Sequence, residues 1–402
     1  MNIVRIALTL AVISTLPLIA ARPAQAQTEK LLHQFTGSPD GATPCAGPVL
    51  KGTTLYGTTM EGGNGTGDTG DGIVYSLTTT GNETILHTFA GNQYGDGSEP
   101  YGGLTLDTKG NLFGTTINGG SSCNCGTIYK LTKSGKNYTE SVLHSFSGSD
   151  GTNPYYVTLV FDKLGNLYGT TNGGGSYGNG TVFKLTPDGV LTTLHNFTGQ
   201  ADGGVPDSGV ALDTKGNIYG VAPGGGAYGY GVLYEITAAG AYSVLYNFTG
   251  AADGMLPRGA PIFKGGKLYG TTQAGGAGCT WGCGVIFEFT LAKGKVAGKE
   301  TVLHTFSGTD GYYPMYGPLT FDKLGNLYGT TLDGGPSNLG NVYELAPDGT
   351  ITTLYNFDQQ PDGMSPMGGV TLDTKGNVYT TAAYGGNDGG EYGGGTVIKV
   401  TP

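Results

Sequence analysis

A short phrase recurs seven times along the chain and constrains its fold more than any other feature. It reads LYGTT in its first copy and keeps an aromatic residue at the second position throughout. The copies are Leu55–Thr59, Leu112–Thr116, Leu167–Thr171, Ile218–Ala222, Leu268–Thr272, Leu327–Thr331 and Val378–Ala382. A period of about 50 residues, built from short β-type segments and glycine-rich turns, is typical of propeller blades. The sequence therefore predicts an all-β fold, a seven-bladed β-propeller.

One repeat, residues 206–257, shows how a blade is expected to form. Four strands are predicted, with the first innermost: Ser208–Asp213, Asn217–Ala222, Gly231–Thr237 and Tyr242–Gly250. A tight hairpin joins the first two, where Gly216 and Asn217 are able to take positive φ. The 78 Gly and 26 Tyr among 402 residues suit many short strands joined by turns. We expect four antiparallel strands per blade in a single domain, residues 27–402.

The two ends of the repeat region carry complementary parts of one blade. Leu31–Gly37 matches a fourth strand, and Gly395–Pro402 matches a third strand. The N-terminal strand is therefore expected to complete the seventh blade, which closes the ring and removes open sheet edges.

Residues 1–26 have the pattern of a cleaved signal peptide. Arg5 precedes an apolar stretch, Ile6–Ala20, that is too short for a spanning helix, and Ala24–Ala26 is an A-x-A cleavage site. No cysteine follows the apolar stretch and no C-terminal anchor is recognised, so we expect a secreted or periplasmic protein without a membrane anchor. Removal of residues 1–26 takes away Arg5 and Arg22, which leaves 18 of the 20 basic residues and all 30 acidic ones. The remaining chain therefore has a formal net charge of −12. That balance disfavours nucleic acid and anionic membranes as partners.

The repeat resembles the GloVer (gloeo/verruco) tandem-repeat family of exported bacterial proteins. The resemblance rests on the LYGTT phrase, on third strands such as Gly180–Gly189 and on fourth strands such as Leu194–Gly199, and it covers nearly all of residues 27–402. It implies a propeller-like fold and export, and it supplies no catalytic residue.

Histidine and aspartate recur at fixed positions, which favours structural roles for both. The histidines are His33, His87, His144, His195 and His304, and Tyr246 and Tyr355 occupy the same position in the other two repeats. An Asp-Gly turn precedes every first strand, at Asp40, Asp96, Asp150, Asp202, Asp253, Asp310 and Asp362. The histidine pattern leaves no free histidine for a catalytic triad or a metal site. A ring of calcium ligands is the alternative for the aspartates, but the spacing lacks alternating oxygen ligands.

The five cysteines predict two local disulfides in an exported chain. Cys123 and Cys125 share one glycine-rich loop, and Cys279 and Cys283 share the equivalent loop of the fifth blade. Cys45 is left over as a buried thiol. The chain has neither a phosphate-binding P-loop nor a dinucleotide fingerprint, so we expect no cofactor and no metal.

Candidate ligand-binding residues gather where the repeats differ. Loops from the fourth to the first strand and from the second to the third strand should share one face, around the mouth of the central channel. Arg258 is the only arginine of residues 27–402 and Trp281 is the only tryptophan; both belong to the fifth blade. Asp207 is placed to pair with Arg258, and four tyrosines should line the mouth: Tyr101, Tyr155, Tyr156 and Tyr316. A structural ion pair with loop packing is the plainer interpretation.

Acidic residues also fall on this face, in loops of the first, sixth and seventh blades. They are Glu61, Asp68, Asp71, Asp333, Asp388 and Glu391. A pair of carboxylates is what glycoside hydrolysis requires, although acids on glycine-rich loops are usually only solvated.

The sequence favours an exported, monomeric binding module for a glycan or a surface protein, with the ligand on the loop face. A carbohydrate-active enzyme, either a glycoside hydrolase or a polysaccharide lyase using these acids or tyrosines, is the alternative. A purely structural surface module is a third possibility.

Overall fold

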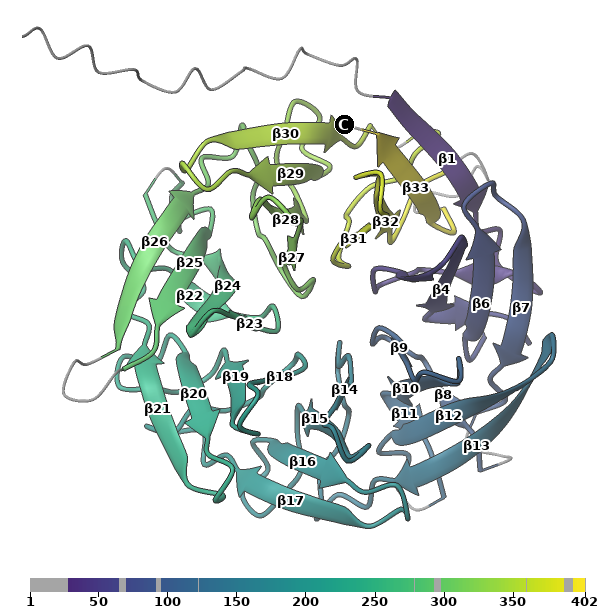
Figure 1. Ribbon diagram of the computed structural model, residues 1–402, viewed down its shortest axis with the longest axis horizontal. Helices are drawn as coiled ribbons and strands as arrows, with labels where there is room; N and C mark the ends of the chain where they lie inside the picture. Colours follow the sequence, from purple (N-terminus) through teal and green to yellow (C-terminus); the bar gives the residue numbers. More distant parts are fainter. Residues whose placement is uncertain are drawn as a thin grey trace, which may run out of the picture.

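The computed structural model is a ring of seven four-stranded antiparallel sheets around a central axis (Figure 1). It describes residues 28–64, 70–91, 95–121, 123–277, 279–292, 298–358, 360–386 and 393–401. The predicted seven-bladed β-propeller is confirmed. No helix in these ranges is long and apolar enough to cross a membrane.

The strands of blades 1 to 6 run outward from the axis in chain order. Blade 1 is β3 (Val49–Lys51), β4 (Thr54–Thr59), β6 (Ile73–Thr78) and β7 (Glu83–Thr88); blade 2 is β9 (Thr105–Leu106), β10 (Leu112–Thr116), β12 (Thr127–Ser134) and β13 (Asn137–Ser145). Blade 3 is β14 (Val160–Phe161), β15 (Leu167–Thr171), β16 (Thr181–Leu185) and β17 (Leu191–Asn196); blade 4 is β18 (Ala211–Leu212), β19 (Ile218–Ala222), β20 (Val232–Ile236) and β21 (Tyr242–Asn247). Blade 5 is β23 (Ile262–Lys264), β24 (Lys267–Ala274), β25 (Val285–Thr290) and β26 (Lys299–Thr305), with β22 (Met255–Pro257) also paired to β24. Blade 6 is β27 (Thr320–Phe321), β28 (Leu327–Thr331), β29 (Asn341–Leu345) and β30 (Ile351–Asn356).

Blade 7 is closed by the N-terminal strand, as predicted. Its order from the axis is β31 (Thr371–Leu372), β32 (Val378–Ala382), β33 (Thr396–Thr401) and β1 (Thr28–Gln34). Leu31 lies opposite Ile398, and Thr28 lies opposite Thr401. The two ends of the chain therefore share one sheet, and Figure 1 shows β1 along the outer edge of β33.

The leucine, the glycine and the threonines of the LYGTT phrase have defined packing roles. Leu55 is fully buried in the core between blades. The glycine is required because a Cβ on Gly169 would stand 2.7 Å from the ring of Phe183 in the next strand. The last two threonines donate to backbone carbonyls; Thr58, for example, donates to Gly102 of the next blade at 3.1 Å. The phrase therefore fixes contacts within a blade and between blades.

The inner hairpins are shorter and more constrained than the sequence indicated. The first strand of blade 4 is only Ala211–Leu212. Gly216 has φ of +88°, as predicted, whereas Asn217 is not among the residues with positive φ. The Asn217 side chain instead donates to Asp213 Oδ2 at 2.9 Å, and Asp213 Oδ1 accepts from the backbone N–H of Lys215 and Asn217.

Candidate functional site

The connections of the propeller define two different faces. Short hairpins between first and second strands, and between third and fourth strands, form what we call the turn face. The long loops between second and third strands pair with the segments that enter the first strands, as β5 (Glu61–Gly62) does with β2 (Gly41–Ala42) and β11 (Asn118–Gly119) with β8 (Gly97–Ser98). These loops form the opposite side, the loop face, as the sequence predicted.

Every blade ties its fourth strand to the following Asp-Gly turn through one side-chain pair. His144 Nε2 lies 2.9 Å from Asp150 Oδ2, and Tyr246 donates to Asp253 Oδ2 at 3.0 Å where tyrosine replaces histidine. The remaining pairs are His33–Asp40, His87–Asp96, His195–Asp202, His304–Asp310 and Tyr355–Asp362. The repeated histidine (or tyrosine) and the repeated aspartate therefore form one recurring structural contact. Sequence reasoning treated them separately, although their spacing was a usable signal.

A glutamate from the next blade lies beside some of these pairs. Glu83 is close to His33 and Asp40, and ligand atoms of the three all lie within 4.8 Å of one another. Burial, and then the charge of Asp40, raise the pKa of Glu83 to about 7. The pKa values of Glu140 and Glu300 are also raised to about 7. The main cause is burial, followed by the charge of Asp96 at Glu140 and of Asp253 at Glu300. The group at Glu83 has the ligand types to hold a divalent cation or to share a proton, and sequence reasoning missed it because Glu83 lies in another repeat.

The mouth of the channel on the loop face carries a stack of tyrosines. Tyr156 of blade 3 and Tyr316 of blade 6 reach toward each other across the axis and stack with their ring centroids 3.7 Å apart. Tyr101 and Tyr155 stack beside them at 4.6 Å, and Tyr101 also meets Tyr156 edge-on at 5.3 Å. The structure thus brings together all four predicted tyrosines. Tyr156 and Tyr316 have φ of +50° and +52°, a conformation that is uncommon for residues other than glycine.

Arg258 and Asp207 form the ion pair that the sequence suggested. Arg258 donates from Nη1 to Asp207 Oδ2 and from Nε to Gln273 Oε1, the latter at 2.6 Å. The guanidinium also lies 5.6 Å from the centre of the Tyr316 ring. Burial raises the pKa of Asp207 to about 6 even though Arg258 opposes the shift, and Asp207 Oδ1 is buried with no hydrogen-bond partner among the described residues. Arg258 is therefore already engaged by protein groups.

A cavity of about 170 Å³ lies in the channel beside the tyrosine stack. Its walls are mainly apolar and include Cys45, Tyr101, Tyr156, Tyr316 and Met367. Met367 Sδ accepts a hydrogen bond from the Tyr156 hydroxyl at 3.4 Å. Cys45 is buried, as expected, and its burial raises the pKa of the thiol.

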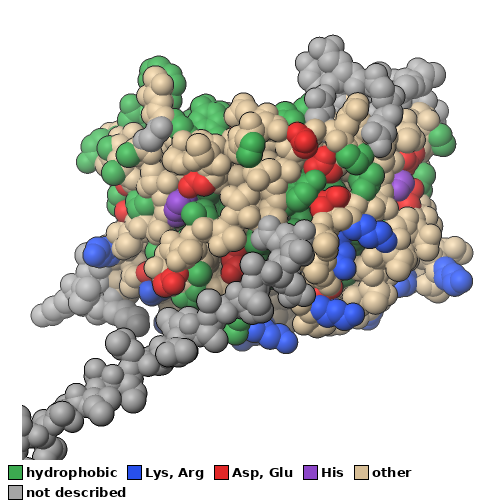
Figure 2. Space-filling model, turned by 90° about the horizontal axis from the view of Figure 1, so that it is seen from above, with side chains coloured by type: hydrophobic (Ala, Val, Ile, Leu, Met, Phe, Trp, Pro, Cys, Tyr) green, Lys and Arg blue, Asp and Glu red, His purple; other side chains and the backbone are tan. Residues whose placement is uncertain are grey.

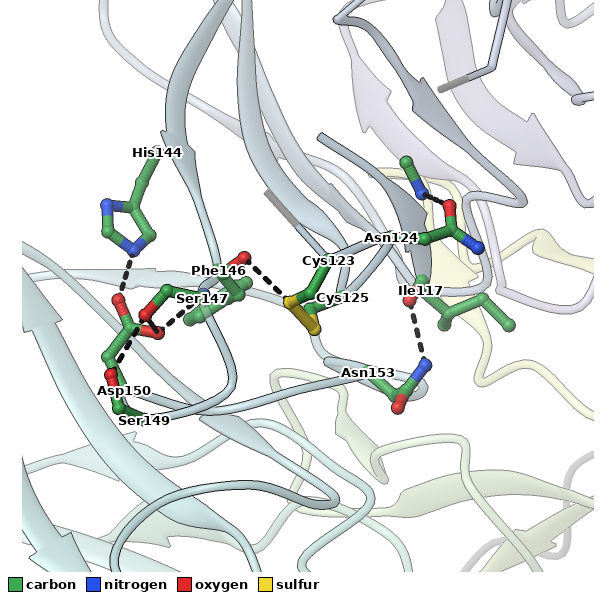
Figure 3. The surroundings of a disulfide bond; sticks show 11 residues. Ile117, Cys123, Asn124, Cys125, His144, Phe146, Ser147, Ser149, Asp150 and Asn153 are labelled. Carbon is green, nitrogen blue, oxygen red and sulfur yellow. Dashed lines mark hydrogen bonds and ion pairs between the residues drawn. A yellow bond between two sulfur atoms is a disulfide. The ribbon is translucent and has the colours of Figure 1, made fainter. Parts of the chain in front are cut away.

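The two predicted cysteine pairs are both joined as disulfides, Cys123–Cys125 and Cys279–Cys283. Figure 3 shows the first bridge between the His144–Asp150 pair and a hydrogen bond of 2.9 Å from the Asn153 side chain to the Ile117 carbonyl. The backbone N–H of Asn153 donates to the Cys125 carbonyl at 2.8 Å, and that of Phe146 donates to the Gly126 carbonyl at 3.0 Å, so the end of this loop is fixed by backbone hydrogen bonds.

Exposed aromatic side chains gather on the loop face of three neighbouring blades. Trp281, next to the Cys279–Cys283 bridge, is 75% exposed. Tyr177 in the loop of blade 3 is 63% exposed, and Tyr228 and Tyr230 in that of blade 4 are 61% and 41% exposed. No described contact joins Trp281 to the tyrosine stack or to Arg258. The tyrosines at 177, 228 and 230 were missed because their glycine-rich loops looked featureless in the sequence.

The predicted acidic residues have separate surroundings where the structure describes them. Glu61 accepts a hydrogen bond from the Thr43 hydroxyl at 3.1 Å. Burial raises the pKa values of Asp71 and Asp333, and Asp96 adds to the shift at Asp71. Asp68, Asp388 and Glu391 lie outside the described residues. Among the described acids, no contact brings two of the predicted set together as a carboxylate pair.

Comparisons with known proteins identify a repeat family and a fold. The model of the Gloeobacter/Verrucomicrobia repeat matches residues 20–221, 64–281 and 266–402. No curated protein matches the sequence. Virginiamycin B lyase from Staphylococcus aureus is similar in structure, with a TM-score of 0.58, 14% identity, and coverage of 94% of this chain and 99% of the lyase. A candidate 6-phosphogluconolactonase from Bacteroides uniformis has a TM-score of 0.52 and 14% identity, with coverage of 87% and 100%. At these identities the two structures support the fold alone.

Proposed function

The chain belongs to the Gloeobacter/Verrucomicrobia repeat family, and from this premise we propose that it is an exported propeller that binds a carbohydrate on its loop face. The observation that carries the proposal is the set of exposed aromatic side chains on blades 3, 4 and 5: Tyr177, Tyr228, Tyr230 and Trp281. Apolar side chains concentrated on one exposed face mark interaction sites. Aromatic rings with a polar edge suit sugars, which combine apolar C–H faces with hydroxyl groups.

The loops of this face are constrained, which lowers the entropic cost of binding. The Cys279–Cys283 bridge closes the loop that carries Trp281, and the ring of Tyr230 lies against Gly250. The Tyr156–Tyr316 stack and the Arg258–Asp207 pair form the floor beside these loops in our proposal. Because Arg258 is held by Asp207 and Gln273, we assign it to positioning Tyr316.

A carbohydrate-active enzyme remains the alternative prediction. Hydrolysis by two carboxylates requires a pair roughly 5–10 Å apart around one sugar bond. The described contacts of Glu61, Asp71 and Asp333 differ, and Asp68, Asp388 and Glu391 lie outside the described residues, so we base the proposal on the exposed aromatic side chains.

The test begins with the full exported protein on a glycan array, followed by measurement of affinity for a glycan that binds. Trp281→Ala and Tyr228→Ala should each weaken binding about ten-fold, since one aromatic contact contributes roughly 1–1.5 kcal/mol. Val190→Ala is the matched control, because Val190 is exposed on the turn face. Wild-type affinity in both aromatic variants, or loss of affinity in the control, would refute the proposed site. Release of shorter sugars from the bound glycan would favour the enzyme.

A further inference from the structure

Each inner hairpin of the turn face carries a lysine. The seven are Lys51, Lys109, Lys163, Lys215, Lys264, Lys323 and Lys375, one for each blade, and all are exposed. They end the first strand, as Lys51 and Lys264 do, or lie within the turn between the first and second strands, so they surround the channel on that side. Lys51 also approaches the backbone carbonyls of Asp107 and Thr108, which links the hairpins of blades 1 and 2. The result is a ring of ammonium groups on one side of the molecule.

Five of the same hairpins also carry an aspartate that is hydrogen-bonded within its turn, so seven lysines face five carboxylates: Asp107, Asp162, Asp213, Asp322 and Asp373. Asp162 accepts from the backbone N–H groups of Leu164 and Asn166 and from the side chain of Asn166. Asp213, Asp322 and Asp373 repeat this arrangement. Their carboxylates therefore point into the turns, whereas the neighbouring lysines extend into solvent.

The two faces differ strongly in charge. Within the described residues, the loops of the loop face contain no lysine and one arginine, Arg258, together with 13 acidic residues. These acids are Asp40, Glu61, Asp71, Asp96, Glu99, Asp150, Asp202, Asp207, Asp253, Asp310, Asp333, Asp358 and Asp362. In Figure 2 the visible Lys and Arg side chains lie toward one rim, and none is seen at the opposite rim. The overall negative charge therefore describes the loop face and not the turn face.

Apolar side chains project from two of the basic hairpins. Leu164 is 82% exposed beside Lys163, and Leu324 is 67% exposed beside Lys323. These hairpins belong to blades 3 and 6, on well-separated parts of the ring (Figure 1). A soluble polyanion would be held by the lysines alone and would leave the leucines in water. A lipid surface accommodates both groups, because its headgroups attract lysine and its interface accepts leucine.

We propose that the turn face docks the propeller on a membrane surface containing anionic lipids, with the lysine ring against the headgroups and Leu164 and Leu324 in the interface. This goes beyond carbohydrate binding, since it uses the opposite face and no residue of the proposed sugar site. The loop face would then point away from the membrane. Charge segregation reverses the expectation drawn from the net charge, because only the face in contact is felt within a Debye length of about 8–10 Å.

The test is sedimentation of the full protein with vesicles of phosphatidylcholine and phosphatidylglycerol in equal parts, and with phosphatidylcholine vesicles as reference. Binding should need phosphatidylglycerol and weaken as salt rises. Lys163→Gln and Lys323→Gln should each reduce partitioning about five-fold, which corresponds to about 1 kcal/mol for one lysine near an anionic surface. Leu164→Ser together with Leu324→Ser should reduce it further at constant charge.

Matched control variants distinguish binding by the turn face from general effects of removing a lysine or an apolar side chain. Val205→Ser removes an exposed apolar side chain from the loop face, and Lys184→Gln removes a half-buried lysine from β16; both should partition as wild type. Thermal melting shows that each variant is folded. Failure to bind the anionic vesicles overturns the proposal, and so does binding that the leucine substitutions leave unchanged. If the protein binds soluble heparin and does not bind the vesicles, the lysine ring is a site for an anionic polymer instead.

Discussion

His144 Nε2 lies 2.9 Å from Asp150 Oδ2, and Asp150 Oδ1 accepts from the backbone N–H of Ser147 at 2.8 Å. One carboxylate thus joins the end of β13 to the turn that leads into blade 3. The imidazole also packs edge-on against Phe146 at 5.1 Å, and Phe146 is fully buried. The His144–Asp150 pair therefore fixes the segment that leaves blade 2 relative to the hydrophobic core.

Removing either partner of this pair should destabilise the propeller. Asp150→Ala should cost about 1–3 kcal/mol, because it also leaves the Ser147 N–H without its acceptor. His144→Ala should cost less, and His144→Tyr should be nearly neutral, since Tyr246 makes the same contact to Asp253 in blade 4. Chemical denaturation of the three variants checks the order. A His144→Tyr variant as unstable as Asp150→Ala would contradict this account.

The three glutamates beside these pairs should make the fold less stable as pH rises from about 5 to about 8. Burial, and then nearby aspartates, raise the pKa values of Glu83, Glu140 and Glu300 to about 7, above the value of 4.5 expected in the unfolded chain. Between these values the folded protein holds more protons than the unfolded one, so stability falls as pH increases. The melting temperature over this range is the measurement.

Replacing all three glutamates by glutamine should flatten that pH dependence. Asp188→Asn is a suitable control, because its hydrogen bonds lower the pKa of Asp188 and it titrates below the window. An unchanged pH profile in the triple variant would show that other groups are responsible.

Contacts within one repeat, and contacts between equal positions of adjacent repeats, were largely predictable from the sequence, whereas other contacts between repeats were not. The seven LYGTT copies predicted the blades, and the split repeat at Leu31–Gly37 and Gly395–Pro402 predicted the closure found in β1 and β33. The Arg258–Asp207 pair was foreseen because both residues occupy the same repeat position in adjacent blades. The Tyr156–Tyr316 stack joins distant repeats across the ring, and the contact of Glu83 with His33 joins different repeat positions of adjacent blades, so neither followed from the repeat pattern.

Deleting residues 27–37 should abolish cooperative melting. The deletion removes β1, which pairs with β33 from Thr28–Thr401 to Gln34–Thr396, and it also removes the buried side chains of Leu32 and Phe35. The exposed edge of β33 is then free to pair with other chains. Melting curves and light scattering test this expectation, and a truncated protein that melts like the full chain and stays in solution would refute it.

Reducing the Cys279–Cys283 bridge should lower the melting temperature modestly and weaken any binding that depends on Trp281. The bridge restricts a glycine-rich loop that is otherwise costly to order. Mass mapping of non-reduced peptides establishes the bond in the exported protein, and Cys279→Ser with Cys283→Ser then measures its effect. Free thiols at both positions in exported protein would contradict the assignment.

Blade 7 provides the sharpest test of how the repeat encodes packing. In six blades a glycine of the second strand faces an aromatic ring of the third, as Gly329 faces Tyr343. Blade 7 instead pairs Thr380 with Ile398. Threonine is larger than the glycine of the other blades, and isoleucine is smaller than their aromatic residue. Both are fully buried, so the two substitutions compensate in volume.

Thr380→Gly alone should leave a void, and Ile398→Tyr alone should overpack the blade, each costing about 1–3 kcal/mol. The double variant recreates the pair of the other six blades and should be more stable than the sum of the single changes by at least about 1 kcal/mol. Urea denaturation of the four proteins measures this coupling. Gly329→Thr with Tyr343→Ile makes the reciprocal exchange in blade 6 and should show coupling of the same sign. Strictly additive effects in both blades would mean that the glycine and the ring are not packing partners, and the repeated glycine would then need another explanation.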